Sequence, residues 1–504
     1  MQFIHELFDE RVRQAPDSKF LFLKDETLTL AQLSLLVDTL KAELKTLGVR
    51  AGDRVLIVAE NCPQQIALIL ACSRVGAWSC GVNARMSKGE VAGFALKADP
   101  RVVYFTDAVS DSAQAHAGDF YAKPSSLFGL LRSEVRAQAV AEPSPLSEQV
   151  ATIIFTSGTT GTPKGVLVSH AGLLQFGRIS AQSRSLDTSD RSYAYLPMTH
   201  IFGLATVLMA SLFAGSSLVV RSTFDPADVF DVLATKSLTQ LQGPPAMFTR
   251  LLTWLDEHQI STPEAPDLRY LYTGAAPMDL SLKQAVEKRF GKPLHHGYGL
   301  SEYAGALCLV RMNEPRNDTA AGYLVDGGEL RIVGSDGVDK LNGETAEIWM
   351  RGVGLMPGYF RDVEATRQVI REGGWYASGD LGYVADDGAL FVVGRLKEMI
   401  IRSGFNVYPG EVESVLCNFP GVQRAAVVGK KTADGNEDVI AFIESVNGRS
   451  PDLAALKLHI DNNLAPYKRP SQLLVKASFP MTFSGKILKR QLLADLDMDR
   501  QASG

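Results

Sequence analysis

The sequence has few of the features of a secreted, disulfide-stabilised protein. It contains 504 residues but only five cysteines, scattered at positions 62, 72, 80, 308 and 417, with no C-x-x-C pair among them. An odd number of scattered cysteines is typical of reduced thiols in the core of a cytoplasmic protein. The N-terminal segment MQFIHELFDERVRQ is charged and helix-periodic, and it has no apolar centre like that of a signal peptide. We therefore expect a cytoplasmic protein.

An excess of positive charge and a long apolar run are also missing. The formal net charge is −5 and no long basic run occurs, which argues against a nucleic-acid-binding surface. Residues 192–220 contain no Asp, Glu, Lys or Arg, a length that could span a bilayer. However, Pro197, Thr199 and His200 lie near its start, and the uninterrupted apolar part, IFGLATVLMASLFAG, has only 15 residues. This stretch predicts a buried core helix and no membrane span.

In the first two thirds of the chain, β-rich apolar runs alternate with amphipathic runs of helix length. RVLIVAE precedes CPQQIALILACSRVGA, and SSLVVRS precedes DPADVFDVLATKS. This alternation is typical of βαβ units, in which helices cover a parallel sheet. No period of 20–50 residues recurs, which argues against a repeat architecture. The fold class expected here is α/β, with parallel-rich sheets and covering helices.

After about residue 325 the pattern changes to short strands separated by Gly and Asp-Gly turns, as in GELRIVGSDG, AEIWMRG and GYVADDGALFVVGR. Beyond GRLKE (394–398), the runs AAVVG and DVIAFIESV predict paired strands, PDLAALKLHIDNNL a helix and SQLLVKASF a further strand. We therefore expect a large N-terminal domain over residues 1–394, including a small β-rich part, and a small α+β domain over residues 395–504.

The segment TSGTTGTPKG (156–165) follows the apolar run VATIIF and predicts a loop that leaves a strand. Its glycines let the backbone approach a ligand, and its N–H groups and hydroxyls form a concavity rich in donors. Lys164 adds a positive charge, so a polyphosphate is the natural ligand. The segment is not a Walker loop, because its lysine follows a proline. An unliganded surface loop remains the alternative on composition alone.

Further motifs follow this loop in a fixed order. Together with it, they resemble those of the adenylate-forming superfamily, which contains acyl-CoA synthetases, the adenylation domains of peptide synthetases and firefly luciferase. The similarity runs nearly end to end and is closest to the acid–CoA ligases. The motifs are PMTHIFG (197–203), YTGAAP (272–277), GYGLSE (297–302), GETAEIWMRG and MPGYF (343–360), YASGDLG (376–382), GRLKEMI (394–400), GFNVYPGEVE (404–413) and SGKILKR (484–490).

The resemblance implies that the protein uses ATP and Mg²⁺ to convert a carboxylic acid into an acyl-adenylate and pyrophosphate, and then transfers the acyl group to a thiol such as coenzyme A. It places the 156–165 loop on the β- and γ-phosphates, Tyr298 against the adenine, and Asp380 on the ribose hydroxyls. The residues expected to bind ATP or AMP are Thr156, Ser157, Gly158, Thr159, Thr160, Gly161, Lys164, Gly274, Ala275, Ala276, Tyr298, Gly299, Ser301, Asp380 and Arg395.

The resemblance also implies catalytic roles. Glu302 is expected beside the Mg²⁺ ion, and Lys486 is expected to touch the substrate carboxylate and the α-phosphate during adenylation. Because Lys486 lies in the small domain, that domain is expected to be mobile and to rotate between the two half-reactions, with its hinge at Lys397. Gly404 and Phe405 are then expected to line the passage for the pantetheine arm of coenzyme A.

The acyl pocket is the least specified part of the site. His200 matches a position where relatives carry a gate beside the pocket, and we expect it to be catalytic, although a lone His in an apolar run is often a core residue. Most of the surrounding residues are apolar, so a fatty or aromatic acid is favoured over an amino acid. The segment MFTRLL, which contains Arg250, resembles the same stretch of malonyl-CoA synthetases, so a dicarboxylic acid remains an alternative substrate. The other residues expected in the pocket are Phe202, Gly203, Met247 and Gly297.

Two other functions remain open from the sequence. The acyl acceptor could be the phosphopantetheine of a separate carrier protein, or the chain could be a nucleotide-binding relative without catalysis. Lys486, Glu302 and Asp380 are all present, which argues against the second alternative. The expected binding partner is a small carboxylic acid. We expect neither nucleic-acid binding nor a membrane span, and we expect the protein to be a monomer or a homodimer.

Overall fold

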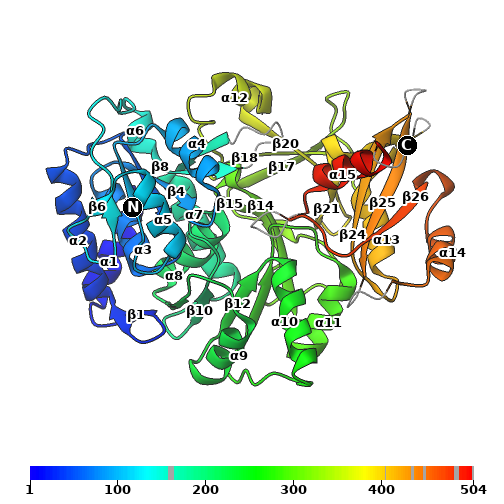
Figure 1. Cartoon of the computed structure of the whole chain (residues 1–504), viewed down its shortest axis with the longest axis horizontal. Helices are drawn as coiled ribbons and strands as arrows, with labels where there is room; N and C mark the ends of the chain where they lie inside the picture. The colour runs from blue at the N-terminus through cyan, green and yellow to red at the C-terminus, as the bar shows by residue number, and fades with distance from the viewer. Residues whose placement is uncertain (157–163, 403–404, 433–435, 446–449, 482–486, 502–504) are drawn as a thin grey trace.

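The computed structural model describes residues 1–156, 164–402, 405–432, 436–445, 450–481 and 487–501. Residues 497–501 are described by their backbone alone. The described chain is built on two large sheets, a smaller antiparallel sheet and a C-terminal part with sheets of its own (Figure 1). Among these residues, no helix combines the length and the apolar character needed to cross a bilayer.

The first large sheet has seven strands and is parallel at its centre. All six residues of the strand Arg54–Ala59 are buried, because apolar side chains cover both faces of the sheet. In sheet order, the strands are β6 (Lys123–Pro124), β7 (Leu131–Arg132), β5 (Val102–Phe105), β3 (Arg54–Ala59), β4 (Trp78–Asn83), β8 (Val150–Thr156) and β9 (Lys164–Ser169).

The second large sheet has nine strands. Pairing is parallel from β14 (Leu294–Leu300) through to β1 (Lys19–Phe22) and antiparallel at both edges. One continuous apolar core contains residues of both large sheets and of the helices that lie between them. In sheet order, the strands are β16 (Tyr323–Leu324), β15 (Gly305–Leu309), β14 (Leu294–Leu300), β13 (Tyr270–Thr273), β12 (Gln240–Gly243), β10 (Arg191–Ala194), β11 (Ser217–Val220), β1 (Lys19–Phe22) and β2 (Thr27–Thr29).

The helices follow the strands as the alternating pattern predicts. A typical start is that of the helix His170–Ser183, where the hydroxyl of Ser169 accepts the N–H of Gly172 at 3.0 Å. The helices before residue 300 are α1 (Ile4–Gln14), α2 (Leu30–Thr46), α3 (Pro63–Arg74), α4 (Lys88–Ala98), α5 (Asp111–Asp119), α6 (Leu146–Gln149), α7 (His170–Ser183), η1 (Phe202–Met209), α8 (Ala210–Ala214), α9 (Pro226–Thr235), α10 (Pro245–Glu257) and α11 (Leu280–Phe290).

The charge-poor stretch forms a buried helix, as the sequence predicts, but of an unexpected kind. The first part of this helix is the π-helix η1 (Phe202–Met209), in which every residue is buried. The helix α8 continues it. π-Helical turns often lie at functional sites. This one begins within the PMTHIFG motif, next to His200.

The third sheet is antiparallel and follows the Gly-punctuated part of the sequence. It contains the strands expected from GELRIVGSDG, AEIWMRG and GYVADDGALFVVGR, all paired antiparallel. The strands are β17 (Gly328–Val333), β18 (Ala346–Gly352), β19 (Ile370–Arg371), β20 (Trp375–Val384) and β21 (Leu390–Arg395), and the helices nearby are η2 (Ser301–Tyr303), α12 (Val363–Val369), η3 (Glu372–Gly374) and η4 (Leu396–Glu398).

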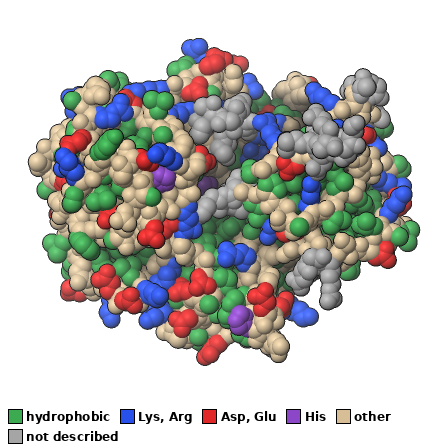
Figure 2. All heavy atoms as spheres, viewed as in Figure 1, with side chains coloured by type: hydrophobic (Ala, Val, Ile, Leu, Met, Phe, Trp, Pro, Cys, Tyr) green, Lys and Arg blue, Asp and Glu red, His purple; other side chains and the backbone are tan. Residues whose placement is uncertain are grey.

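The C-terminal part has a three-stranded sheet whose two faces carry different cores, one against α13 and α14 and the other against α15. It lies at the right of Figure 1, and the surface is hollowed between it and the larger part, with Lys and Arg side chains along the rim (Figure 2). Its elements are β22 (Ile400–Arg402), β23 (Phe405–Val407), α13 (Pro409–Cys417), β24 (Val422–Lys431), β25 (Glu437–Ser445), α14 (Leu453–Asn463), η6 (Pro466–Lys468), β26 (Gln472–Lys476) and α15 (Lys489–Gln501).

The α/β fold class is thus confirmed, with a large N-terminal part, a small β-rich sheet and an α+β C-terminal part. The strand pair and the helix expected near the C-terminus are present as β24, β25 and α14. The boundary between residues 394 and 395 stays a prediction.

Candidate active site

The two ends of the predicted phosphate loop are held together. Thr156, at the end of β8, pairs with Lys164, at the start of β9. Several residues expected in the site lie outside the described part of the chain. They are Ser157, Gly158, Thr159, Thr160, Gly161, Gly404 and Lys486.

A tyrosine joins this loop to the expected metal-binding carboxylate. Lys164 Nζ lies 4.6 Å from the centroid of the Tyr359 ring, and the Tyr359 hydroxyl donates to Glu302 Oε1 at 3.0 Å. The Glu302 carbonyl accepts the N–H of Met356 at 2.8 Å, and the Gly165 carbonyl accepts that of Phe360 at 2.7 Å. Three segments that are distant in sequence therefore meet at Glu302, Lys164 and Tyr359.

Glu302 occupies an environment that suits a cation. It follows β14 in the short helix η2, and burial raises the pKa of its carboxyl, while the hydrogen bond from Tyr359 opposes this shift. A desolvated carboxylate is stabilised by a positive charge placed against it. The described residues hold no group of three or more His, Cys, Asp or Glu that could bind a metal alone.

Asp380 is fixed by two donors. Its Oδ2 accepts the hydroxyl of Tyr298 at 2.7 Å, and its Oδ1 lies 2.9 Å from Nε of Arg395, its partner across the β20–β21 pair. The backbone N–H of Asp380 donates to Ser378 Oγ at 3.0 Å. Burial raises the pKa of the Tyr298 phenol well above its usual value, so this group remains a donor. The carboxylate is therefore held in one orientation, and Asp380 is buried.

The expected adenine wall also lies at a strand end. Gly274, Ala275 and Ala276 follow β13 directly, and Ala275 has a positive φ of 67°, which turns the chain away from the sheet. Gly299 lies where β14 bulges against β15, and a side chain there would clash with the carbonyl of Gly305. Ser301, the first residue of η2, is buried. Gly299 and Ser301 are neighbours of Tyr298 and Glu302 along the chain, whereas residues 274–276 follow β13, which pairs with β14.

Part of the expected acyl pocket is brought together around Tyr272, a residue to which the sequence assigned no role. The Phe202 ring meets the Tyr272 ring edge-on at 5.8 Å, and a side chain at Gly297 would clash with the Tyr272 hydroxyl. His200 lies just before this group, and its Nδ1 accepts the N–H of Phe202 at 3.2 Å. Gly203 packs against the carbonyls of residues 196 and 197, which leaves no room for a side chain.

Met247 and Arg250 are both in α10. Met247 belongs to the apolar cluster formed by α9, α10 and α11, separate from the cluster that contains Phe202 and Tyr272. Arg250 is exposed, with its guanidinium 4.6 Å from the centroid of the Phe224 ring. Met247 lies against Gly243 at the end of β12, and its role in the acyl pocket, like that of Arg250, stays a prediction.

The expected hinge lies at the start of the C-terminal part. Lys397 is in η4, two residues after Arg395, and burial lowers the pKa of its ammonium group. The next residue, Glu398, is tied to the start of α15, because its Oε2 lies 3.2 Å from Lys489 Nζ. Phe405, expected in the pantetheine passage, is exposed and stacks on Tyr467 with ring centroids 4.7 Å apart.

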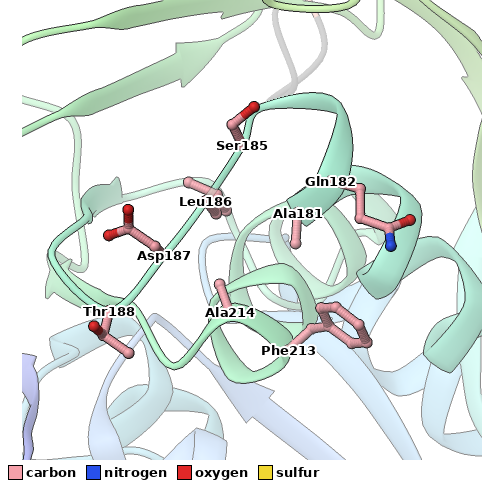
Figure 3. Close-up of a pocket in the computed structure, with 8 residues that line it drawn as sticks. All are labelled: Ala181, Gln182, Ser185, Leu186, Asp187, Thr188, Phe213 and Ala214. Atoms are coloured by element: carbon pink, nitrogen blue, oxygen red, sulfur yellow. The ribbon is translucent and has the colours of Figure 1, made fainter.

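A surface pocket of about 500 Å³ lies apart from this site, between the C-terminal end of α7 and the end of α8 (Figure 3). None of the residues expected in the site lines it. Its lining residues are Ala181, Gln182, Ser185, Leu186, Asp187, Thr188, Phe213 and Ala214.

Two tyrosines that link the parts of the site have no role among the expectations from the sequence. Tyr359 lies in MPGYF and Tyr272 in YTGAAP, so both are within motifs that the resemblance had singled out. Each is a buried aromatic residue with a hydroxyl, a residue type that usually finds a partner. Their partners, Glu302 and the pocket of Phe202, are distant in sequence and emerge only from the fold.

The chain matches the family models of the AMP-binding enzyme, over residues 8–360, and of the AMP-binding enzyme C-terminal domain, over residues 411–486. It is 31% identical over 508 residues to an indoleacetate–CoA ligase of Aromatoleum aromaticum, covering 97% of this chain and 98% of the relative. It is likewise 31% identical to 4-coumarate–CoA ligase 3 of Oryza sativa subsp. japonica, covering 94% of this chain and 88% of the relative.

Solved structures give the same result. The ATP-bound MatB of Rhodopseudomonas palustris superposes with a TM-score of 0.84 at 26% identity, covering 97% of this chain and 98% of that one. The o-succinylbenzoate CoA synthetase of Bacillus subtilis, in complex with its acyl-adenylate intermediate, gives 0.82 at 25% identity, covering 96% of this chain and 97% of that one.

The chain belongs to the AMP-binding enzyme family, the adenylate-forming enzymes. Within that family it is an acid–CoA ligase, which activates a carboxylic acid with ATP through an acyl-adenylate and transfers the acyl group to coenzyme A.

Proposed function

We propose that this ligase activates an aromatic acid, with the carboxylate and ATP meeting between Lys164, Glu302 and Asp380. The observation that carries the proposal is the convergence of Lys164, Tyr359 and Glu302 beside the ends of the 156–165 loop. The rings of Phe202 and Tyr272, which meet edge-on in the expected acyl pocket, offer an aromatic lining that suits a flat acyl group. The ligases named above that act on indoleacetate and 4-coumarate support an aromatic acid here.

The reaction brings a carboxylate to a triphosphate, so the protein must offset like charges and align the reacting atoms. Glu302 is the residue proposed to hold Mg²⁺, which would neutralise phosphate charge. Lys164 would contact the leaving phosphates, and Asp380 would accept the ribose hydroxyls in the orientation that Tyr298 and Arg395 set. Lys486 is proposed to stabilise the charge that develops between the carboxylate and the α-phosphate.

The second half-reaction is proposed to use the other side of the C-terminal part. Rotation at Lys397 would withdraw Lys486 and present Phe405 to the pantetheine thiol. A carrier-protein acceptor, a cytoplasmic location and a monomeric or homodimeric state remain predictions from the sequence.

Pyrophosphate release with a panel of aromatic and fatty acids, with and without coenzyme A, tests this proposal. We expect release with aromatic acids and a thioester product when coenzyme A is present. Acid-dependent release without any thioester would favour the carrier-protein acceptor. Absence of release with every aromatic acid, but turnover of fatty acids, would contradict the proposed substrate class.

Replacement of Glu302 by glutamine tests the metal-binding role. The amide keeps an oxygen for the Tyr359 hydroxyl but removes the negative charge, so the apparent Mg²⁺ affinity should fall at least about tenfold. The measurement is the initial rate of pyrophosphate release against Mg²⁺ concentration at saturating ATP. Glu344→Gln, on the exposed turn before β18, is the matched control. An unchanged Mg²⁺ dependence would remove Glu302 from the metal site.

A further inference from the structure

Beside Tyr272, the second large sheet carries buried polar side chains that the proposed chemistry does not use. Gln242 in β12 pairs in register with Tyr272 in β13, Gln240 pairs with Tyr270, and Ser192 in β10 pairs with Gln240. Alternate residues of a strand point to the same face of a sheet, so the two glutamines share the face of Tyr272. Ser192, Gln240 and Gln242 all have 0% of their surface exposed.

These side chains are incompletely hydrogen-bonded. Within the described part of the chain, Gln242 Nε2, both polar atoms of the Gln240 amide and Ser192 Oγ have no partner. A buried polar atom without a partner costs roughly 1–3 kcal/mol, so such atoms are uncommon unless a ligand or ordered water completes them. Their presence on adjacent strands points to one shared polar site.

A buried arginine sets the orientation of Gln242. Arg184, 2% exposed at the end of α7, donates from Nη1 to Gln242 Oε1 at 2.6 Å. The amide oxygen of Gln242 is therefore turned toward Arg184, and its Nε2 is available to another acceptor. Arg184 also donates from Nη2 to the carbonyl of Thr206 in η1 at 2.6 Å. The guanidinium thus connects the sheet to the helix that begins with Phe202.

This polar group adjoins the pocket expected for the acyl chain. Tyr272 contacts Phe202 and lies against Gly297, and it is the register neighbour of Gln242. The positive charge of Arg184 acts on the phenols of both Tyr270 and Tyr272 and opposes the rise in their pKa that burial causes. The expected site residues 274–276 and 299–302 lie at or beyond the carboxyl ends of β13 and β14, whereas Gln240 and Gln242 lie inside β12, so we expect the two glutamines at the end of the pocket remote from Glu302.

We propose that the acid carries a neutral oxygen substituent, a hydroxyl, at the end remote from its carboxylate, and that Gln242 Nε2 donates to that oxygen. Gln240 Oε1 offers an acceptor for the hydroxyl proton. This inference rests on the proposed function, because it concerns the acid bound at the same site. It makes Gln242 a specificity-determining residue.

The hydrogen bonds of Arg184 favour a neutral group over a second carboxylate. The guanidinium donates four hydrogen bonds to protein acceptors. Nε and Nη2 each donate to Ser180, Nη2 also donates to Thr206, and Nη1 donates to Gln242. A guanidinium has five N–H groups, so one remains, and the paired contact that binds a carboxylate is not available. A dicarboxylate would therefore bury a charge with only partial compensation.

The test compares matched acids that differ by one hydroxyl. The ratio of kcat/KM for 4-hydroxycinnamate to that for cinnamate, and the same ratio for 4-hydroxyphenylacetate and phenylacetate, are measured by pyrophosphate release. We expect at least one pair to favour the hydroxylated acid about tenfold or more, and 4-carboxycinnamate to be the poorest of the cinnamates. In Gln242→Leu that ratio should fall to within about threefold of one, chiefly through the KM of the hydroxylated acid.

Two further variants make the result decisive. Gln240→Leu removes an amide that bonds to no described group, so it tests the same site if Gln242→Leu fails to fold, and it too should lower the ratio. Tyr104→Phe removes another buried hydroxyl, in the first large sheet, and should leave the ratio unchanged.

The outcomes separate this inference from the proposed function. Turnover of the unsubstituted acids with a ratio near one would overturn the inference, would indicate that water fills the polar site, and would leave the aromatic-acid ligase intact. Preference for 4-carboxycinnamate would overturn it in favour of a dicarboxylate. Absence of pyrophosphate release with every aromatic acid would overturn both.

Discussion

Replacement of Lys486 by alanine is expected to lower the rate of acyl-adenylate formation by about two to three orders of magnitude. Removing one preorganised donor from a site of developing charge typically costs this much. The residue lies outside the described part of the chain, so the expectation rests on the SGKIL motif. The measurement is acid-dependent pyrophosphate release in the absence of coenzyme A. Thioester formation from supplied acyl-adenylate should stay within about threefold of the unmodified enzyme.

The comparison of the two half-reactions distinguishes a catalytic role from a structural one. Lys457→Ala, an exposed lysine of α14, is the matched control and should change neither rate. An equal loss of both half-reactions in Lys486→Ala would contradict the account in which the C-terminal part alternates between two positions. An unchanged rate of pyrophosphate release would remove Lys486 from the site.

Replacement of Asp380 by alanine is expected to raise the KM for ATP by about a hundredfold or more. In the proposed complex, the carboxylate accepts the ribose hydroxyls, and each hydrogen bond to a charged group contributes roughly 1.5–3 kcal/mol. The change also strands the Tyr298 hydroxyl and the Arg395 guanidinium, which both contact Asp380. The measurement is the ATP dependence of pyrophosphate release, with KM and kcat determined separately.

Asp231→Ala, on the exposed face of α9, is the control for loss of one carboxylate and should leave the KM for ATP unchanged. Thermal melting of both variants without nucleotide separates a binding defect from loss of the fold. A KM for ATP within about threefold of normal in Asp380→Ala would contradict the ribose-binding role.

Local patterns in the sequence were sufficient to predict much of the fold. The run RVLIVAE predicts β3, because a strand buried on both faces is apolar throughout, and CPQQIALILACSRVGA predicts α3. The Asp-Gly turn in GYVADDGALFVVGR predicts the β20–β21 hairpin. These features depend on neighbours in the sequence, which is why they could be predicted without a structure.

The connections within the site could not be predicted in this way. The bond from Tyr359 to Glu302 joins residues that are 57 positions apart. The group of Arg184, Gln242 and Tyr272 depends on the register of β12 with β13 and on the packing of α7 against them. The π-helical form of η1 is another such feature, because IFGLATVLMASLFAG predicts a helix but not its hydrogen-bond spacing. Long-range packing decides each of these, and hydrophobic periodicity carries no information about it.

The claim that nucleotide and acid meet between Lys164, Glu302 and Asp380 is tested most directly by a crystal structure with Mg²⁺ and an ATP analogue that cannot be cleaved between its α- and β-phosphates. We predict the adenine beside Tyr298, the ribose hydroxyls on Asp380, and the β- and γ-phosphates within hydrogen-bonding distance of the 156–165 loop. A nucleotide bound elsewhere, with that loop and Asp380 uncontacted, would contradict the account.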